Sequence, residues 1–154
     1  MDIFILVPSL SPEGPVKGAI ALANELVKQR NIVLVVLKPG KGVHAPIDEK
    51  IKVISLYQIK SWRMRLTAYK DYLKKSGGKD NVASISSCFS ADIFNLFCRG
   101  HAVTCSSVRG NLPDNYKLEY GWRGSLLALV HLILLRGFDH VVAMTASMGK
   151  QVSR

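Results

Sequence analysis

The chain has 154 residues, 48% of them hydrophobic, and its 21 lysines and arginines against 11 acidic residues give a formal net charge of +10. This length and composition predict one α/β domain with a full hydrophobic core, and they are too small for two. The excess of positive charge predicts an anionic partner such as a phosphate group, a nucleic acid or an acidic lipid surface, and charge alone does not rank these three.

The first 37 residues predict a β-α-β unit. Two apolar runs, 3–7 and 32–37, have no polar face, which is typical of strands buried on both sides of a parallel sheet. Between them, a Pro/Ser/Gly loop at 9–18 leads into a helix with one apolar face, which we expect to end in a left-handed cap at Asn31. Such a unit presents the loop after its first strand to a ligand.

The rest of the chain continues this alternation of strands and helices. We expect an outer strand at 51–56, a helix with a basic face at 61–76, a strand at 81–87, a short helix at 91–98 capped by Ser90, a strand at 102–108, a loop at 109–120, an apolar helix at 122–135, a strand at 140–144 and the opening of a helix at 147–154. The basic face of the helix at 61–76 comprises Arg63, Arg65, Lys70, Lys74 and Lys75. For the helix at 122–135 we favour burial in the core over docking on lipid or on another domain.

Six strands alternating with helices predict a Rossmann-like α/β fold, a doubly wound parallel sheet with helices on both faces and the strand order 3-2-1-4-5-6. In this fold the carboxyl ends of strands one, four, five and six share one rim. The rim would therefore collect the loops at 9–17, 87–90, 109–116 and 145–147.

Two of these loops contain candidate ligand-binding residues. Gly14 stands near the start of the first helix, where backbone N–H groups could meet a phosphate or a sugar hydroxyl, and Lys17 could add a charge. Arg109 ends the fifth strand, where a guanidinium can hold a phosphate or carboxylate at two points, and Gly110 would let that ligand approach.

Each candidate has a purely structural alternative, which the sequence leaves open. Gly14 and Pro15 could only shape a turn while Lys17 is solvated. Arg109 could instead pair with Asp92 or Asp114 to fasten its loop.

Several common sites are disfavoured. The first loop lacks G-x-G-x-x-G, and no G-x-x-x-x-G-K-[ST] occurs, which argues against NAD and ATP. Cys88, Cys98 and Cys105 lack the spacing of a disulfide framework or a zinc site, so we expect reduced thiols and no metal. We expect the four histidines to lie away from the rim and to have structural roles; these are His44, His101, His131 and His140.

The sequence shows neither a membrane-spanning segment nor a signal peptide, and we therefore expect a cytoplasmic protein. The longest apolar stretch, 126–135, is too short to span a membrane. Asp2 stands where a signal peptide would have a basic region, and the apolar run at 3–7 is too short for the core of such a peptide.

The opening strand at 3–10, the loop at Gly14, the helix at 19–26 and the second strand at 30–36 together resemble the N-terminal domain of the family 4 retaining glycosyltransferases. Later stretches fit the same arrangement, at 90–92, 109–113 and 141–147. These enzymes have the GT-B fold, in which two Rossmann-like domains face each other. The resemblance covers essentially the whole chain, although Glu13 occupies the loop where the family usually has a pair of glycines.

The resemblance implies that this chain is the acceptor-binding half of the enzyme. Its binding residues for the acceptor or the donor phosphates would be Glu13, Gly14, Lys17, Ser90, Arg109, Gly110 and Asn111. A C-terminal domain, absent from residues 1–154, would bind the nucleotide-sugar donor and supply the paired glutamates of the family. No cofactor or metal is implied, and this chain alone would be inactive.

The implied reaction is transfer of a sugar, with retention at the anomeric carbon, from a nucleotide-sugar to a glycan or a lipid-linked acceptor. It would take place in the cytoplasm, peripherally at the inner face of the membrane, so an anionic membrane surface joins the expected partners. The first alternative is a basic Rossmann-like module that binds nucleic acid, which is weaker because the basic residues are not interleaved with exposed aromatics. The second is a sugar-nucleotide epimerase of the same GT-B fold.

Overall fold

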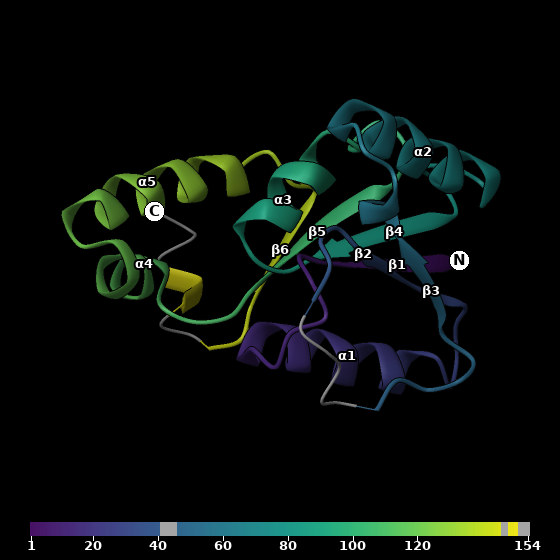
Figure 1. Cartoon of the computed structure of the whole chain (residues 1–154), viewed down its shortest axis with the longest axis horizontal. Coiled ribbons are helices and arrows are strands. Elements are labelled where there is room, and N and C mark those ends of the chain that lie inside the picture. Colours follow the sequence, from purple (N-terminus) through teal and green to yellow (C-terminus); the bar gives the residue numbers. More distant parts are fainter. Residues whose placement is uncertain (41–45, 146–147, 151–154) are drawn as a thin grey trace.

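The computed structural model describes residues 1–40, 46–145 and 148–150, and it is built around a six-stranded sheet (Figure 1). The strands are β1 (Asp2–Val7), β2 (Ile32–Val36), β3 (Lys52–Ser55), β4 (Val82–Ser86), β5 (Val103–Val108) and β6 (His140–Ala143). The helices are α1 (Gly14–Leu26), α2 (Trp62–Lys75), α3 (Phe89–Leu96), α4 (Leu112–Tyr120) and α5 (Trp122–Leu135), with a short 3-10 helix at Leu56–Gln58. His44 and residues 146, 147 and 151–154 lie outside the described residues.

The sheet has the predicted topology. All neighbouring strands pair in parallel, in the order β3-β2-β1-β4-β5-β6. At its centre, Ile5 of β1 pairs with Leu34 of β2 on one side and with Ile85 of β4 on the other. The doubly wound Rossmann-like fold is therefore confirmed, with the outer strand β3 largely exposed as expected.

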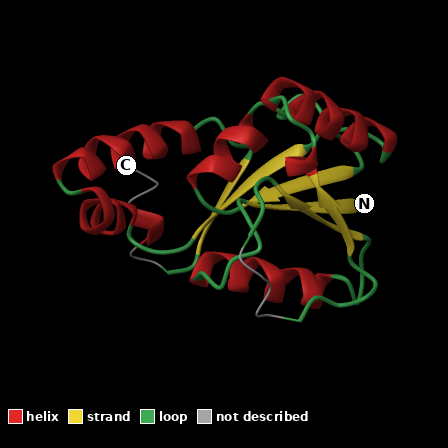
Figure 2. Cartoon of the chain, in the orientation of Figure 1, coloured by secondary structure: helices red, strands yellow, loops and turns green. Residues whose placement is uncertain are grey.

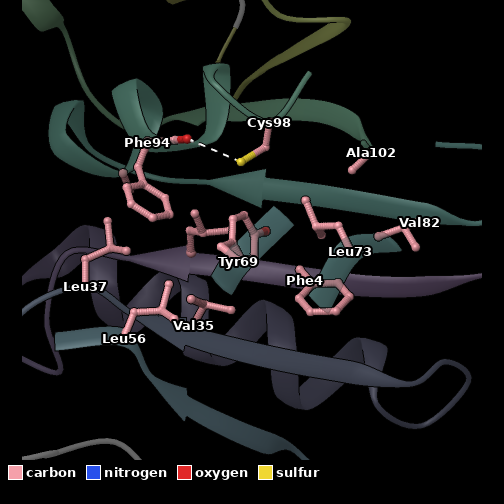
Figure 3. Packing of buried hydrophobic residues seen from close by; sticks show 12 residues of the cluster. Phe4, Val35, Leu37, Leu56, Tyr69, Leu73, Val82, Phe94, Cys98 and Ala102 are labelled. Atoms are coloured by element: carbon pink, nitrogen blue, oxygen red, sulfur yellow. Dashed lines mark hydrogen bonds between the residues drawn. The ribbon is translucent and has the colours of Figure 1, made fainter. Parts of the chain in front are cut away.

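Helices cover both faces of this sheet and bury a different set of side chains on each (Figure 2). Because side chains alternate along a strand, Ile3, Ile5 and Val7 of β1 pack toward α1, while Phe4 and Leu6 pack toward α2 and α3. Tyr69 of α2 and Phe94 of α3 fill the second core, where Tyr69 lies between Phe94 and Phe4 (Figure 3). The continuous apolar runs of β1 and β2 are explained by this two-sided burial.

Two predicted helix ends are wrong. Helix α1 ends at Leu26, and hydrogen-bonded turns follow it. Asn31 does not adopt the left-handed conformation of the predicted cap. Its side chain instead donates a hydrogen bond to the carboxylate of Asp2 at 3.2 Å. Helix α3 begins at Phe89 with Cys88 as the preceding cap residue, so Ser90 lies within the first turn and is not the cap. Helix α1 therefore ends earlier, and helix α3 begins earlier, than the capping side chains in the sequence indicate.

The prediction of a loop at 109–120 is also wrong, because most of this segment forms helix α4. Asn111 caps this helix by accepting a hydrogen bond from the backbone N–H of Asp114, and Pro113 lies in the first turn. An Asn cap followed by a proline in the first turn is a helix-start signal. The loop prediction overlooked it because residues 114–120 are mostly polar or charged.

Helix α5 has the predicted bounds, but its expected burial is only half right. Gly124, Ala128, His131 and Leu135 are buried against the rest of the protein. The opposite side is open to solvent and carries Trp122, Leu126, Leu129, Val130 and Ile133, whose exposed fractions range from 41% to 77%. Among the residues that the structure describes, no helix combines the length and apolar character needed to cross a bilayer.

Arg65 does not belong to the exposed basic face predicted for helix α2. Its half-buried guanidinium donates hydrogen bonds to three backbone carbonyls, those of Ile59 (2.5 Å), Tyr57 (3.2 Å) and Leu37 (3.3 Å). These carbonyls belong to the loop after β2 and to the segment between β3 and α2. Arg65 therefore joins two connections on the same edge of the sheet.

Replacement of Arg65 by lysine should lower the free energy of unfolding by about 2 kcal/mol, because one ammonium group cannot reach three carbonyls that a planar guanidinium satisfies together. Denaturation in urea measures this change. Arg63→Lys on the exposed side of the same helix is the control, and it should stay within about 0.5 kcal/mol of the wild type. Equal effects of the two variants would contradict the role assigned to Arg65.

Candidate functional site

A cavity of about 440 Å³ opens at the carboxyl ends of the central strands. The loops after β1, β2, β4 and β5 and the inner sides of α4 and α5 form its walls. This is the rim on which loops of a doubly wound sheet converge, at the point where the strand order reverses between β1 and β4. The cavity therefore occupies the position at which this fold ordinarily binds ligands.

The structure brings three of the predicted site residues together in this cavity, namely Glu13, Ser90 and Arg109. The remaining four, Gly14, Lys17, Gly110 and Asn111, do not line it. Lys17 is exposed on α1, and Asn111 is committed to capping α4. Gly110 serves a backbone need, since its φ of +112° is a conformation that favours glycine.

The guanidinium of Arg109 lies against helix α1, where a Cβ on Gly18 would collide with it. Its Nε is fully buried and has no hydrogen-bond partner among the residues that the structure describes. Neither Asp92 nor Asp114 forms an ion pair with it, so the alternative in which Arg109 fastens its own loop does not hold. Lys38 lines the same cavity, together with three carboxylates, those of Glu13 in the first loop, Asp92 of α3 and Glu119 of α4.

A buried carboxylate, an imidazole and a phenol form a hydrogen-bonded series in the opposite wall. Asp92 of α3 accepts a hydrogen bond from His131 Nε2 at 2.8 Å, and His131 Nδ1 lies 2.9 Å from the hydroxyl of Tyr116. Asp92 and His131 are each 2% exposed. Both His131 and Tyr116 line the cavity, so this series connects the core to the ligand space.

The carboxylate sets the direction of these hydrogen bonds. An ionised carboxylate can only accept hydrogen bonds, so Nε2 of His131 carries the proton that is donated to Asp92. In the neutral ring Nδ1 has no proton, and it therefore accepts a hydrogen bond from the Tyr116 hydroxyl. Burial, followed by the charge of Asp92, raises the pKa of Tyr116, so this phenol stays protonated. Its oxygen keeps a lone pair that can accept a hydrogen bond from a ligand hydroxyl.

The same carboxylate is held by serines of two strands. Asp92 Oδ1 accepts from Ser86 Oγ of β4 at 2.6 Å and from Ser106 Oγ of β5 at 2.9 Å. Ser86 in turn accepts from Asn95 Nδ2 at 3.0 Å, one helical turn after Asp92. Buried polar groups of this kind are stable only when each finds a partner, and here the partners come from both strands and from α3.

The series continues into the core beneath α2. Asn95 Oδ1 accepts from Ser84 Oγ at 2.5 Å, and Ser84 Oγ lies 2.7 Å from the hydroxyl of Tyr69, which is completely buried. Burial raises the pKa of Tyr69 well above its ordinary value. An unbroken row of hydrogen bonds thus runs from the middle of the sheet to the cavity.

Cys88 occupies the turn between β4 and α3 in a strained backbone conformation. Its φ is +77°, and it is the one residue other than glycine with a positive φ in the part of the chain that the structure describes. Burial, and then the negative charges of Asp92 and Glu13, raise the pKa of its thiol to about 11, although Arg109 acts in the opposite direction. The thiol therefore lines the cavity in its protonated form and is a poor nucleophile.

The sequence-based view of the histidines is wrong for His131, which is an element of this cavity. It was missed because its helix reads as uniformly apolar, and a lone histidine in such a helix is typical of a core position. The signal that could have found it is the set of polar residues at inward positions of two buried strands, Ser84 and Ser86 in β4 and Thr104 and Ser106 in β5. Such positions require a buried polar partner.

The cavity combines two kinds of chemistry. One side offers positive charge from Arg109 and Lys38, suited to a phosphate or diphosphate. The other offers hydroxyl, imidazole and carboxylate groups, suited to the hydroxyls of a sugar or alcohol. Among the described residues, no group of three or more His, Cys, Asp and Glu side chains is placed to hold a metal ion.

No protein-family model matches the chain, and a search of curated proteins finds no match.

Replacement of Asp92 by alanine should lower the free energy of unfolding by about 3–5 kcal/mol, because it leaves two serine hydroxyls and the Nε2–H of His131 without an acceptor in the core. Chemical denaturation measures the loss. The matched control is Asp71→Ala on the exposed side of α2, which should change stability by less than about 0.5 kcal/mol. A small effect of Asp92→Ala would show that the buried series contributes little to the fold.

Alkylation of Cys88 by iodoacetamide at pH 8 should be about a hundredfold slower in the folded protein than in urea, because a thiol with a pKa of about 11 has about a hundredth of the thiolate of an unperturbed cysteine. The rate in the folded protein should still be rising at pH 11, whereas in urea it should be near half-maximal at about pH 9 and level off by about pH 10. Peptide mass spectrometry distinguishes Cys88 from Cys98 and Cys105. A plateau near pH 9 in the folded protein would contradict the raised pKa.

Proposed function

We propose that this chain is the acceptor-binding domain of a retaining glycosyltransferase of GT-B type, which moves a sugar from a nucleotide-sugar to a glycan or lipid-linked acceptor. The observation that carries the proposal is the pairing, in one cavity at the strand-order reversal, of a guanidinium whose buried Nε has no hydrogen-bond partner among the described residues with a carboxylate-backed imidazole and phenol. The likeness of several sequence stretches to that family supports the same function.

The phosphate side of the cavity is assigned to Arg109 and Lys38. A sugar leaves its nucleotide as negative charge develops on the diphosphate, and donors held in place before the reaction stabilise that charge most effectively. Arg109 fits this role because its buried Nε is not committed to another group and Gly18 leaves room for its guanidinium. The donor nucleotide itself would be bound by a C-terminal domain facing this rim.

The hydroxyl side is assigned to Tyr116, His131 and Glu13. The phenol oxygen of Tyr116 accepts a hydrogen bond from the acceptor hydroxyl and is itself oriented by its bond to His131, which Asp92 holds in one tautomer. Glu13 binds further hydroxyls at the mouth of the cavity. In this scheme the acceptor is positioned for attack on the anomeric carbon.

The reaction is placed in the cytoplasm, at the inner face of the membrane when the acceptor is lipid-linked. The net charge of +10 suits both a diphosphate-bearing substrate and an anionic surface. No nucleic acid partner is proposed, because the cavity is a pocket for small polar groups and not an extended groove with stacked aromatics.

The proposal is tested on the protein carrying its C-terminal domain, incubated with a panel of nucleotide-sugars and with total lipid and glycan extracts. Transfer of labelled sugar to an acceptor, with the anomeric configuration of the donor retained by NMR, is the expected result. A changed nucleotide-sugar in the absence of acceptor would instead identify an epimerase. Tight DNA binding that weakens steeply with salt, without sugar transfer, would identify a nucleic-acid-binding module.

In that assay, Arg109→Ala should lower turnover at least tenfold while the melting temperature stays nearly unchanged, because the buried Nε has no hydrogen bond to lose among the described residues, whereas the guanidinium would stabilise the leaving diphosphate. Gly18→Ala should show part of the same loss, since a methyl group there displaces the guanidinium without removing its charge. The exposed Arg63→Ala controls for net charge and should retain full turnover. Parallel losses of stability and turnover in Arg109→Ala would make Arg109 a structural residue.

A further inference from the structure

Helix α5 exposes an apolar face that the fold does not cover. Its exposed apolar residues are Trp122, Leu126, Leu129, Val130 and Ile133, and we call this set the outer face of α5. Trp122 is 77% and Leu126 is 63% exposed. Single exposed apolar side chains are ordinary on a protein surface, but a continuous row of five on one helix marks a contact surface.

The spacing of these residues places them on one side of the helix. At about 100° per residue, the five positions fall within an arc of about 100°. The buried residues Gly124, Ala128, His131 and Leu135 lie on the opposite side. The helix is therefore apolar on both sides, and packing within the described part of the chain accounts for only the buried side.

Positive charge borders the outer face. Arg123 and Arg136 are both exposed and fall on opposite edges of the apolar arc by the same helical spacing. The guanidinium of Arg123 lies 5.5 Å from the ring centre of Trp122. Residues 121–138 contain no Asp or Glu, so the helix itself carries only positive charge.

The outer face is joined to the cavity through the same pair of helices. His131 and Leu127 of α5 and Tyr116 and Tyr120 of α4 line the cavity, while the exposed row lies on the far side of α5. Helices α4 and α5 lie together at one end of the molecule (Figure 1). Whatever covers the outer face is thereby brought close to the ligand space.

We propose that the outer face of α5 docks on an anionic lipid bilayer. Trp122 and the aliphatic side chains enter the boundary between headgroups and acyl chains, while Arg123 and Arg136 bind lipid phosphates. A tryptophan beside basic residues, with an apolar row along the helix, is the pattern of a helix that lies in the membrane interface. The surface depends on its own observations and does not require the sugar-transfer function.

A second copy of the chain fits the outer face less well than a bilayer. It would place arginines against arginines across the interface between two molecules of net charge +10 each. An anionic surface instead pairs with these cations and accepts apolar side chains without requiring a complementary shape. If the proposed function also holds, docking here presents the cavity to an acceptor anchored in lipid.

Vesicle co-sedimentation of this chain tests the proposal without any donor or transfer reaction. The probes are vesicles of phosphatidylcholine alone and vesicles in which about a third of the lipid is phosphatidylglycerol, a composition whose negative surface potential attracts basic residues. The expected result is binding to the anionic vesicles that weakens with added salt, a blue shift of tryptophan fluorescence, and little binding to phosphatidylcholine.

Three variants assign that binding to the outer face. Leu126→Ser combined with Ile133→Ser should weaken it at least tenfold, and Arg123→Gln should weaken it about fivefold. Met64→Ser is the matched control, since Met64 on α2 is 63% exposed, as Leu126 is, but lies away from the outer face. It should bind as the wild type does. Circular dichroism checks that every variant is folded.

Several outcomes would overturn the proposal. They are the absence of binding to anionic vesicles, equal binding to both vesicle types, and equal weakening by Met64→Ser. Self-association measured by analytical ultracentrifugation and abolished by Leu126→Ser with Ile133→Ser would assign the face to a second copy. Failure of vesicle binding would leave sugar transfer to a water-soluble glycan unaffected, so the two proposals fail independently.

Discussion

The buried carboxylate of Asp92 is the group on which the arrangement of the cavity depends. A carboxylate that is 2% exposed is strongly destabilising unless its oxygens accept hydrogen bonds. Here the carboxylate oxygens accept hydrogen bonds from Ser86 of β4, Ser106 of β5 and His131 of α5. Because Asp92 itself lies on α3, one side chain ties four elements together directly behind the ligand space.

This requirement explains features that an apolar core would not need. Serines occupy inward positions in the neighbouring strands β4 and β5, where valine or isoleucine would otherwise be expected in a parallel sheet. Asn95 and Tyr69 extend the same hydrogen bonding toward α2. Movement of β4 past β5 by even one residue would point the serines to the other face, so the polar row also fixes the strand register.

The fold could be predicted from the sequence to a large extent, and the cavity only in part. The apolar runs of β1 and β2 and the regular alternation with helices are local patterns, and they are sufficient to determine a doubly wound sheet and its strand order. The convergence of loops on one rim follows from that topology, which is why the loops that contain Arg109, Glu13 and Ser90 could be expected to meet. Helix α4 was missed although Asn111 and Pro113 signal its start, because its polar residues favoured a loop.

The part that could not be predicted depends on contacts between distant segments. His131 reaches Asp92 across 39 positions of sequence, and nothing near His131 distinguishes it from a histidine of an ordinary core helix. Arg65 likewise reads as one of five cations on a basic helix, yet it binds the carbonyls of Leu37, Tyr57 and Ile59. Apolar content alone could not show which side of α5 would remain uncovered, since both sides have the same character.

Helices α4 and α5 are in close contact at Gly124, whose Cβ, if it had one, would overlap the backbone at Tyr116. The hydrogen atom in place of a side chain thus permits this close contact between the two helices, whose side chains Tyr116 and His131 form the hydrogen bond between phenol and imidazole. A methyl group at this position would act as a wedge between the helices. One small residue, itself outside the ligand space, therefore sets the width of one of its walls.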